Sequence, residues 1–276
     1  MTASKRWLPL TFKIALLTLL LLWTLIPIVW MVLSSFKPNT IITADTPQVF
    51  FTPTLEHYVS LFSSGNSLWP YLLNSLFIAG TSTLIAVVLG CMAGFGLSRI
   101  RIKGKQHLAF WIISTRMAPI AAVIVPLYLL FRYLYLLDTH AGLIVAYLSF
   151  NLPFAIWLMT AFFDDLPPDL EEAAMIDGAT KFQAFRHVVL PLMTPGLVTT
   201  AILCFIFAWN DYAFAQTFSG PSTQTIPIAA AQLLTQTGID WGKLLAIGTI
   251  VVCPMAIAGL LVKRWLVQGL TLGAVK

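Results

Sequence analysis

Few residues in the apolar part of this sequence can do chemistry. Trp209, Asn210 and Asp211 stand together in one apolar segment, and Arg116 and Asn151 lie in two others. A polar or charged group in such a segment is costly, so it usually faces a protein interior and marks a pathway. Aromatic faces pack on the C–H surface of a sugar, whereas amides and carboxylates bind its hydroxyl groups. The set therefore suits a polyol, and a carboxylate capped by another helix is the structural alternative for Asp211.

Arg116 leaves two interpretations open. A helix that starts after Pro191 places Asp211 about 30 Å further along, in the outer half of a bilayer. Arg116 can pair with Asp211 there, or it can lie near the inner face and extend its guanidinium to the headgroups. The sequence favours neither arrangement.

Other kinds of site find no support in the residue spacing. Gly104-Lys105 and Gly242-Lys243 lack the upstream glycine and the following Ser or Thr of a phosphate-binding loop. The four histidines are scattered, and the three cysteines lie in apolar segments without metal-ligand spacing. No serine stands in a nucleophile elbow. We therefore predict a protein without a catalytic site, a metal site or a cofactor of its own.

Composition indicates what must position these residues. The chain is 58% hydrophobic and 10% charged, far from the soluble average of about a quarter charged. An apolar run of about 20 residues spans a bilayer as a helix. The sequence predicts an all-α membrane protein, a single domain over residues 1–276, with six transmembrane helices over 14–33, 71–97, 108–131, 142–163, 192–218 and 244–262.

Basic residues orient these six helices. With the N-terminus inside, twelve bases fall on the inner side and three on the outer side, and Arg116 is intramembrane. The positive-inside rule then places both termini and the segment between the fourth and fifth helices in the cytoplasm. The four bases from Arg99 to Lys105 are explained by this topology, so we expect no nucleic-acid partner.

That inner segment, 164–191, is rich in acids and reads as a helix-turn-helix. Asp177-Gly178 is a turn in which glycine can take the left-handed conformation that ends a helix. Thr180 and Gln183 fit a capping box at the start of the second helix, and Pro191 is expected to limit it. Each helix is too short to be stable alone in water.

The two helices of this segment each carry an apolar side, and two interpretations remain open. The segment is either a loop that rests on the chain's own membrane helices or a docking element that a partner protein completes. The residues concerned are Leu170, Ala173 and Ala174 in the first helix and Phe182, Phe185 and Val189 in the second.

The same segment carries a long, specific motif. Glu172-Ala173-Ala174, then Gly178 after three residues, then Val188, Leu190 and Pro191 resemble the EAA loop of ABC-importer permeases. The resemblance implies a type I permease fold in which this cytoplasmic loop seats in a cleft of a separate ATPase subunit. The coupling residues it implies are Glu172, Ala173, Ala174, Asp177, Gly178, Leu190 and Pro191.

Three further stretches narrow the resemblance. Residues 115–119, 207–211 and 269–276 are similar to the second permease subunit of maltose-type carbohydrate importers, with trehalose and disaccharide members looking closest. The resemblance implies an inner-membrane location, with lipid around the chain. It implies as partners a second homologous permease, two copies of an ATPase that binds ATP and Mg²⁺, an external binding protein and a sugar. It also implies that the tail residues Gly273, Ala274 and Val275 reach the ATPase.

Two functions from other classes compete with this interpretation. Asp211 could be the proton site of an ion-coupled secondary transporter, although no internal repeat of the kind found in such carriers is evident. A polytopic membrane enzyme would need a catalytic constellation that the residue spacing does not offer.

Overall fold

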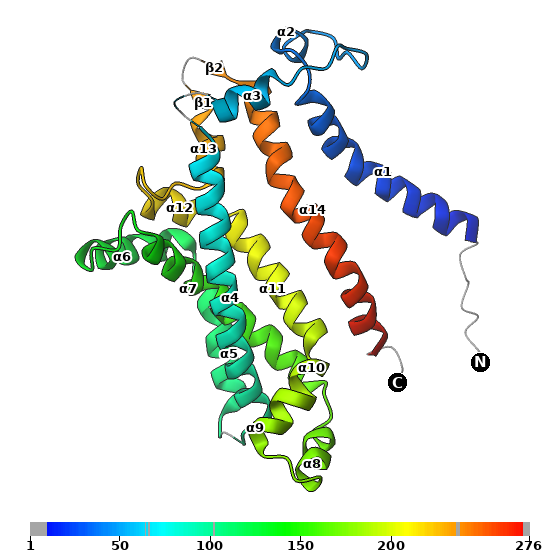
Figure 1. The fold of residues 1–276 in the computed structure, drawn as a ribbon, viewed down its shortest axis with the longest axis vertical. Helices are drawn as coiled ribbons and strands as arrows, with labels where there is room; N and C mark the ends of the chain where they lie inside the picture. The colour runs from blue at the N-terminus through cyan, green and yellow to red at the C-terminus, as the bar shows by residue number, and fades with distance from the viewer. Residues whose placement is uncertain (1–9, 64, 66, 102, 236–237, 273–276) are drawn as a thin grey trace. The chain divides into compact units, whose positions relative to one another are not determined.

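The structure is a computed structural model that describes residues 10–63, 65, 67–101, 103–235 and 238–272. It is almost entirely helical, as Figure 1 shows. The chain divides into two units: residues 1–67 with 232–252, and residues 68–231 with 253–276. Each unit has its own internal packing.

Among the described residues, four helices are long and apolar enough to cross a membrane: α1 (Leu10–Ser34), α4 (Trp69–Arg99), α7 (His140–Asp164) and the Trp241–Leu260 part of α14 (Trp241–Leu272). Two bent pairs pass the same test and raise the number to six. The first joins residues 105–117 to α6 (Ile120–Tyr133) with a bend of 89°, and the second joins residues 181–192 to α11 (Thr194–Trp209) with a bend of 68°. The prediction of an all-α protein is confirmed, and the predicted six spans are reached when each bent pair counts as one span.

The larger unit is built on three neighbouring helices, α4, α7 and α11, which Figure 1 shows side by side. Small residues let α4 and α7 approach: a Cβ on Gly90 would lie 2.7 Å from the Cβ of Ala155, and one on Gly94 would lie 2.9 Å from the Cβ of Met159. Together with Ala86, these glycines form a small-residue stripe at four-residue spacing, which brings membrane helices into close contact.

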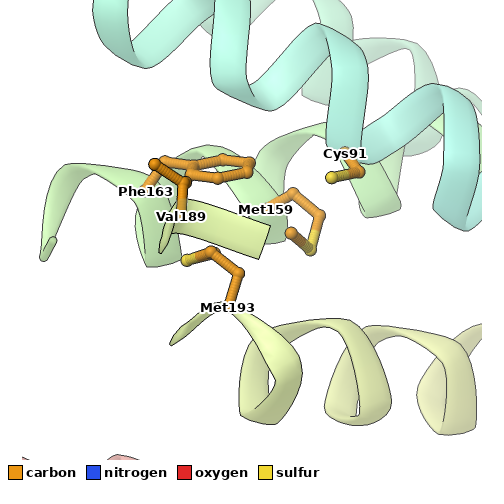
Figure 2. Close-up of a cluster of buried hydrophobic side chains, with 5 residues drawn as sticks. All are labelled: Cys91, Met159, Phe163, Val189 and Met193. Carbon is orange, nitrogen blue, oxygen red and sulfur yellow. The ribbon is translucent and has the colours of Figure 1, made fainter. Parts of the chain in front are cut away.

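A buried apolar cluster ties this bundle to the EAA loop. Figure 2 shows the side chains of Cys91, Met159, Phe163, Val189 and Met193, which converge from α4, from α7 and from the segment that precedes α11. Phe95 adds ring contacts, with its centroid 5.4 Å from that of Phe163 and 4.7 Å from that of Phe185. The loop therefore rests on packed side chains at one end of the bundle.

The rest of the larger unit consists of short elements. They are α5 (Lys105–Ser114), the 3-10 turn η1 (Thr115–Met117), α8 (Asp169–Ile176), α9 (Lys181–Ala184), the π-helical turn η2 (Phe185–Val189), α10 (Leu190–Leu192), α12 (Ala213–Phe218) and most of α13 (Ile226–Gln232).

The smaller unit holds α1, α2 (Asn39–Ile42), α3 (Glu56–Ser63), a two-stranded antiparallel hairpin and the first part of α14. The hairpin pairs β1 (Leu234–Thr235) with β2 (Gly238–Ile239). Gly242 at the start of α14 packs against α3, because a Cβ there would lie 2.1 Å from the ring of His57. Glycine is therefore what lets α14 begin beside this ring.

Two predicted boundaries are wrong. Pro191 does not limit the second helix of the EAA loop, because it lies in the first turn of α10, where a proline loses no intrahelical hydrogen bond. The fifth predicted helix, 192–218, is not continuous. It stops at Trp209, and α12 begins only at Ala213.

Candidate functional site

The EAA loop, residues 164–191, folds as the predicted helix-turn-helix, with α8 and α9 at the lower end in Figure 1. Gly178 has φ +94°, the left-handed conformation expected of it, and a Cβ there would meet no atom within 4 Å. The Thr180 hydroxyl accepts from the backbone N–H of Gln183, whose side-chain oxygen accepts from the backbone N–H of Thr180. The predicted capping box is confirmed.

Arg99, the last residue of α4, ties the loop to the bundle. Its Nε donates to Glu171 Oε1 at 2.5 Å, and both side chains are about 15% exposed, at 14% and 16%. Its two terminal nitrogens donate to the carbonyl oxygens of Phe163 at 3.0 Å and Leu166 at 2.8 Å. A planar guanidinium can serve three acceptors at once, so one side chain fixes the end of α7 and the first turn of α8.

The apolar residues of the loop separate into two groups. Phe185 and Val189 pack inward on the cluster of Figure 2. Phe182 is 68% exposed and Ile176 is 85% exposed. Part of the second helix therefore rests on the chain's own bundle, as one interpretation predicted, whereas Phe182 and Ile176 are left uncovered by the described residues.

Other EAA residues are also on the surface of the chain. Glu172, Ala173, Asp177 and Gly178 are exposed, and no described residue pairs with the Glu172 carboxylate. Ala174 and Leu190 are half-buried, and Pro191 is exposed. The motif thus places an acidic group and a bare turn next to the exposed apolar side chains.

The three predicted pathway residues at the end of α11, Trp209 to Asp211, lie in different environments. Trp209 is buried and stacks on Phe205 at a centroid distance of 5.5 Å. Asn210 is exposed, and its Nδ2 donates to the carbonyl of Ile206 at 2.7 Å and lies 3.4 Å from the sulfur of Met255.

Asp211 accepts hydrogen bonds from the start of the short helix α12. Its Oδ1 accepts from the backbone N–H groups of Phe214 at 3.0 Å and Ala215 at 3.2 Å, which lie in the first turn of α12. A carboxylate in this position satisfies amides that have no intrahelical partner. The carboxylate therefore caps α12 after the break that Asn210 to Tyr212 introduce.

Of the two interpretations of Arg116, the structure bears on the ion pair with Asp211, which is not formed among the described residues. Its guanidinium carbon lies 4.2 Å from the ring centroid of Phe207 and 4.6 Å from that of Phe154, between α11 and α7. No described carboxylate lies within ion-pair distance of it, so the pairing with Asp211 is absent here. The two ring faces stabilise the cation instead.

Asn151 lies on α7 and is fully buried. Its Nδ2 donates to the carbonyl of Cys204 on α11 at 3.1 Å, while its Oδ1 has no partner among the described residues. Asn151 and Phe154 thus face α11 from neighbouring turns of α7, Asn151 through Cys204 and Phe154 through Phe207. Arg116 meets this same side of α7 and α11 through Phe154 and Phe207.

Three residues of the site were not singled out from the sequence. Arg99 was counted only as a topology signal, and Glu171 only as one of the acids at the start of a helix. Phe207 was part of a motif without a role of its own. The aromatic spacing gave no signal that Arg116 would lie between rings from two other helices. Gly273, Ala274 and Val275 lie outside the described residues.

The family described as "Binding-protein-dependent transport system inner membrane component" matches residues 86–271. A trehalose transport system permease protein of Mycobacterium tuberculosis is 38% identical over 96% of this chain and 97% of its own length. A trehalose/maltose transport system permease protein of Thermococcus litoralis is 34% identical over 91% of both chains.

A solved structure has the same fold. A chain of a bacterial ABC transporter involved in the import of the acidic polysaccharide alginate superposes with a TM-score of 0.71. The alignment covers 94% of this chain and 99% of that one at 24% identity.

Proposed function

The chain belongs to the family of binding-protein-dependent transport system inner membrane components, and we propose that it is the permease of an ATP-driven importer whose cargo is a di- or oligosaccharide such as trehalose. The cargo is inferred from the names of its relatives, which include trehalose and trehalose/maltose permeases. We treat residues 1–276 as one transmembrane permease domain, with residues 164–191 as its coupling element.

The proposed coupling role rests on how the EAA loop is held. Arg99 and the cluster around Phe163 and Val189 hold it firmly to the bundle, yet Ile176 and Phe182 remain uncovered. A loop that is rigid on one side and apolar on the other is suited to transmit the movement of a partner. We infer that an ATPase subunit covers this side and that Gly178 and Glu172 set how it docks.

The proposed complex contains four further subunits. They are a second homologous permease, two copies of a cytoplasmic ATPase, and an external binding protein that delivers the sugar. ATP and Mg²⁺ are bound by the ATPase rather than by this chain. We place both termini and the EAA loop in the cytoplasm, since twelve of the sixteen bases flank that side. The tail residues Gly273, Ala274 and Val275 are proposed to reach the ATPase as well.

The mechanism that this arrangement supports is alternating access. Closure of the ATPase dimer on ATP would move the EAA loop, and Arg99 would pass that movement to both α4 and α7 because it contacts the ends of both. The helices then rock between inward-open and outward-open arrangements, which makes the permease a two-state element biased from another subunit.

For the sugar pathway we propose Arg116, Asn151, Trp209, Asn210 and Asp211. Support comes from Asn151, whose buried Oδ1 lacks a partner among the described residues, and from Asn210, whose amide is exposed beside α11. No described residue accepts a hydrogen bond from the Arg116 guanidinium, and its neighbours Phe154 and Phe207 offer ring faces on which a sugar can pack. A proton site at Asp211 is less well supported, because its Oδ1 already accepts two backbone hydrogen bonds.

Docking of the ATPase is tested by Phe182→Ala. Phe182 is 68% exposed in this chain, so truncation should leave the permease folded while it weakens ATPase retention and uptake. Phe110→Ala is the matched control, because this α5 residue is 67% exposed and lies outside the EAA loop. ATPase retained on the purified complex is the measurement. Equal retention in both variants would show that the exposed apolar side does not dock the ATPase.

Cargo is tested separately. The external binding protein should bind a di- or oligosaccharide in a calorimetric screen that also includes amino acids and inorganic ions. A binding protein that takes only amino acids would refute the sugar assignment and leave the importer assignment untouched.

A further inference from the structure

A cavity in the smaller unit has no role in coupling or in the proposed sugar pathway. It has a volume of about 400 Å³ and is lined by the end of α1, the segment that follows it and the start of α14. Its polar lining includes Lys37, Asp45 and Gln48, and its aromatic lining is Trp30 and Trp241. The cavity therefore lies where two membrane-spanning helices end.

Lys37 is the unusual member of this lining. It is 3% exposed, and no described residue makes an ion pair or a hydrogen bond with its ammonium group. Its Nζ lies 4.0 Å from the ring centroid of Trp30 and 5.3 Å from that of Phe51. Aromatic faces stabilise a cation in part. A buried ammonium still needs an acceptor to offset its lost hydration.

The backbone around Lys37 is held in place, which limits where its ammonium group can lie. His57 Nε2 donates to the Lys37 carbonyl at 2.8 Å. Ser35 Oγ and Tyr58 OH are 2.6 Å apart, and the rings of Phe36 and Tyr58 are in contact at 5.2 Å. These contacts fix residues 35–37 to α3.

Asp45 supplies the opposite charge on the same cavity. It is exposed, it forms no ion pair with Lys37, and no described residue neutralises it. A ligand that satisfies both groups carries an anion and a cation separated by a short linker. A simple anion would satisfy Lys37 but would be repelled by Asp45.

The surroundings indicate a lipid as the source of that zwitterion. Every residue from Leu10 to Trp30 on α1 is exposed, and most of them are apolar, so acyl chains can lie along this helix. Trp30 and Trp241 are 41% and 45% exposed, and tryptophan at the end of a span is typical of the headgroup level of a bilayer. Headgroup phosphates are found at the same depth.

We propose that this cavity binds the headgroup of a zwitterionic phospholipid with a primary ammonium group, such as phosphatidylethanolamine. The phosphate accepts from the Lys37 ammonium, the lipid ammonium donates to the Asp45 carboxylate, and Gln48 is available to the ester oxygens. The bound lipid fastens the end of α1 to the start of α14 within the smaller unit.

The test uses the purified transporter complex, stripped of lipid and titrated with single lipids while native mass spectrometry counts those bound. Phosphatidylethanolamine should bind more tightly than phosphatidylglycerol or phosphatidylcholine. Lys37→Met should weaken its binding by about tenfold or more, the effect of losing one charge-assisted hydrogen bond. Lys37→Arg should retain it. Asp45→Asn should remove the preference over phosphatidylglycerol.

Lys243→Met is the matched control, because it removes a lysine of the same unit that pairs with Asp240 at 3.0 Å and does not line the cavity. It should leave lipid binding unchanged. The proposal is overturned if Lys37→Met binds phosphatidylethanolamine as the wild type does. It also fails if inorganic phosphate displaces the lipid completely, or if phosphatidylglycerol binds equally and Asp45→Asn has no effect.

Discussion

Arg99 and Glu171 lie 72 positions apart in the sequence, and their side chains meet at 2.5 Å where α4 ends and α8 begins. The pair is mostly shielded from water, and the same guanidinium also holds two backbone carbonyls at the end of α7. The first helix of the EAA loop is thus attached to the membrane bundle through one side chain.

Removal of this attachment should loosen α8. We expect Arg99→Ala to destabilise its docking by about 2–3 kcal/mol, since it leaves a shielded carboxylate and two carbonyls without their donor. Hydrogen exchange over residues 169–176 should accelerate, and ATP hydrolysis should become less dependent on substrate. Lys105→Ala is the control: its ion pair with Asp164 is longer, at 3.4 Å, and more exposed, so its loss should cost about 0.5 kcal/mol. Equal exchange in both variants would contradict the assigned role of Arg99.

Substitution of Gly178 should act through backbone strain alone. A side chain there meets no atom within 4 Å, but φ of +94° disfavours any residue with a Cβ by about 1 kcal/mol or more. We expect Gly178→Val to remain in the membrane, to retain less ATPase and to lose uptake, because the turn that sets the second helix is strained. Binding of sugar to the external protein should not change.

Gly104 provides a matched control for this strain. It also has positive φ, +78°, and open space around its Cβ position, but it lies between α4 and α5, outside the EAA loop. Gly104→Val should therefore carry a similar backbone strain and keep its ATPase. If Gly178→Val keeps both ATPase and substrate-stimulated hydrolysis, the loop is not the coupling element.

The helix-capping role of Asp211 can be tested separately from its negative charge. Asp211→Ala removes the acceptor of two α12 amides and should cost about 1 kcal/mol of local stability. Asp211→Asn keeps an oxygen for those amides and removes only the charge. If the residue lines the pathway as proposed, both variants should assemble normally but should transport poorly. Normal uptake by Asp211→Asn would reduce the residue to a helix cap.

Asp138 holds a second loop and should respond to pH. Its Oδ1 accepts from Gly220 N at 2.9 Å, Ser222 N at 3.2 Å and Thr223 Oγ1 at 2.8 Å. Burial raises the pKa of this carboxyl, but hydrogen bonds from Thr223, Gly220 and Ser222 outweigh burial and hold it below its ordinary value. Since the folded pKa is the lower one, the stabilisation is complete at neutral pH and is lost as pH falls through it.

Thermal unfolding of the complex between neutral pH and pH 3 should show this loss. We expect Asp138→Asn to lower stability by about 1–3 kcal/mol at neutral pH and to flatten the acid part of the profile. Asp240→Asn, which removes an exposed ion pair with Lys243, should follow the wild-type profile. An acid profile of Asp138→Asn as steep as that of the wild type would assign the pH dependence to other carboxyls.

The sequence by itself determined the features that depend on neighbouring residues. Six apolar segments predicted the spans, because length and hydrophobicity alone decide whether a helix can cross a bilayer. The turn at Gly178 and the capping box of Thr180 and Gln183 followed from conformational preference and from hydrogen bonds over three residues. The break after Trp209 was not predicted, because the apolar length of a segment does not say where its helix is interrupted.

Only the tertiary structure decided which helix faces meet. Phe182 and Phe185 are three residues apart on the same predicted apolar side, yet one is exposed and the other packs on Phe95. Arg116 lies between Phe154 and Phe207 because α7 and α11 bring those rings together, and no local pattern relates the three positions. Such contacts depend on how helices rotate and approach one another, which in α4 and α7 is set by the glycines at 90 and 94.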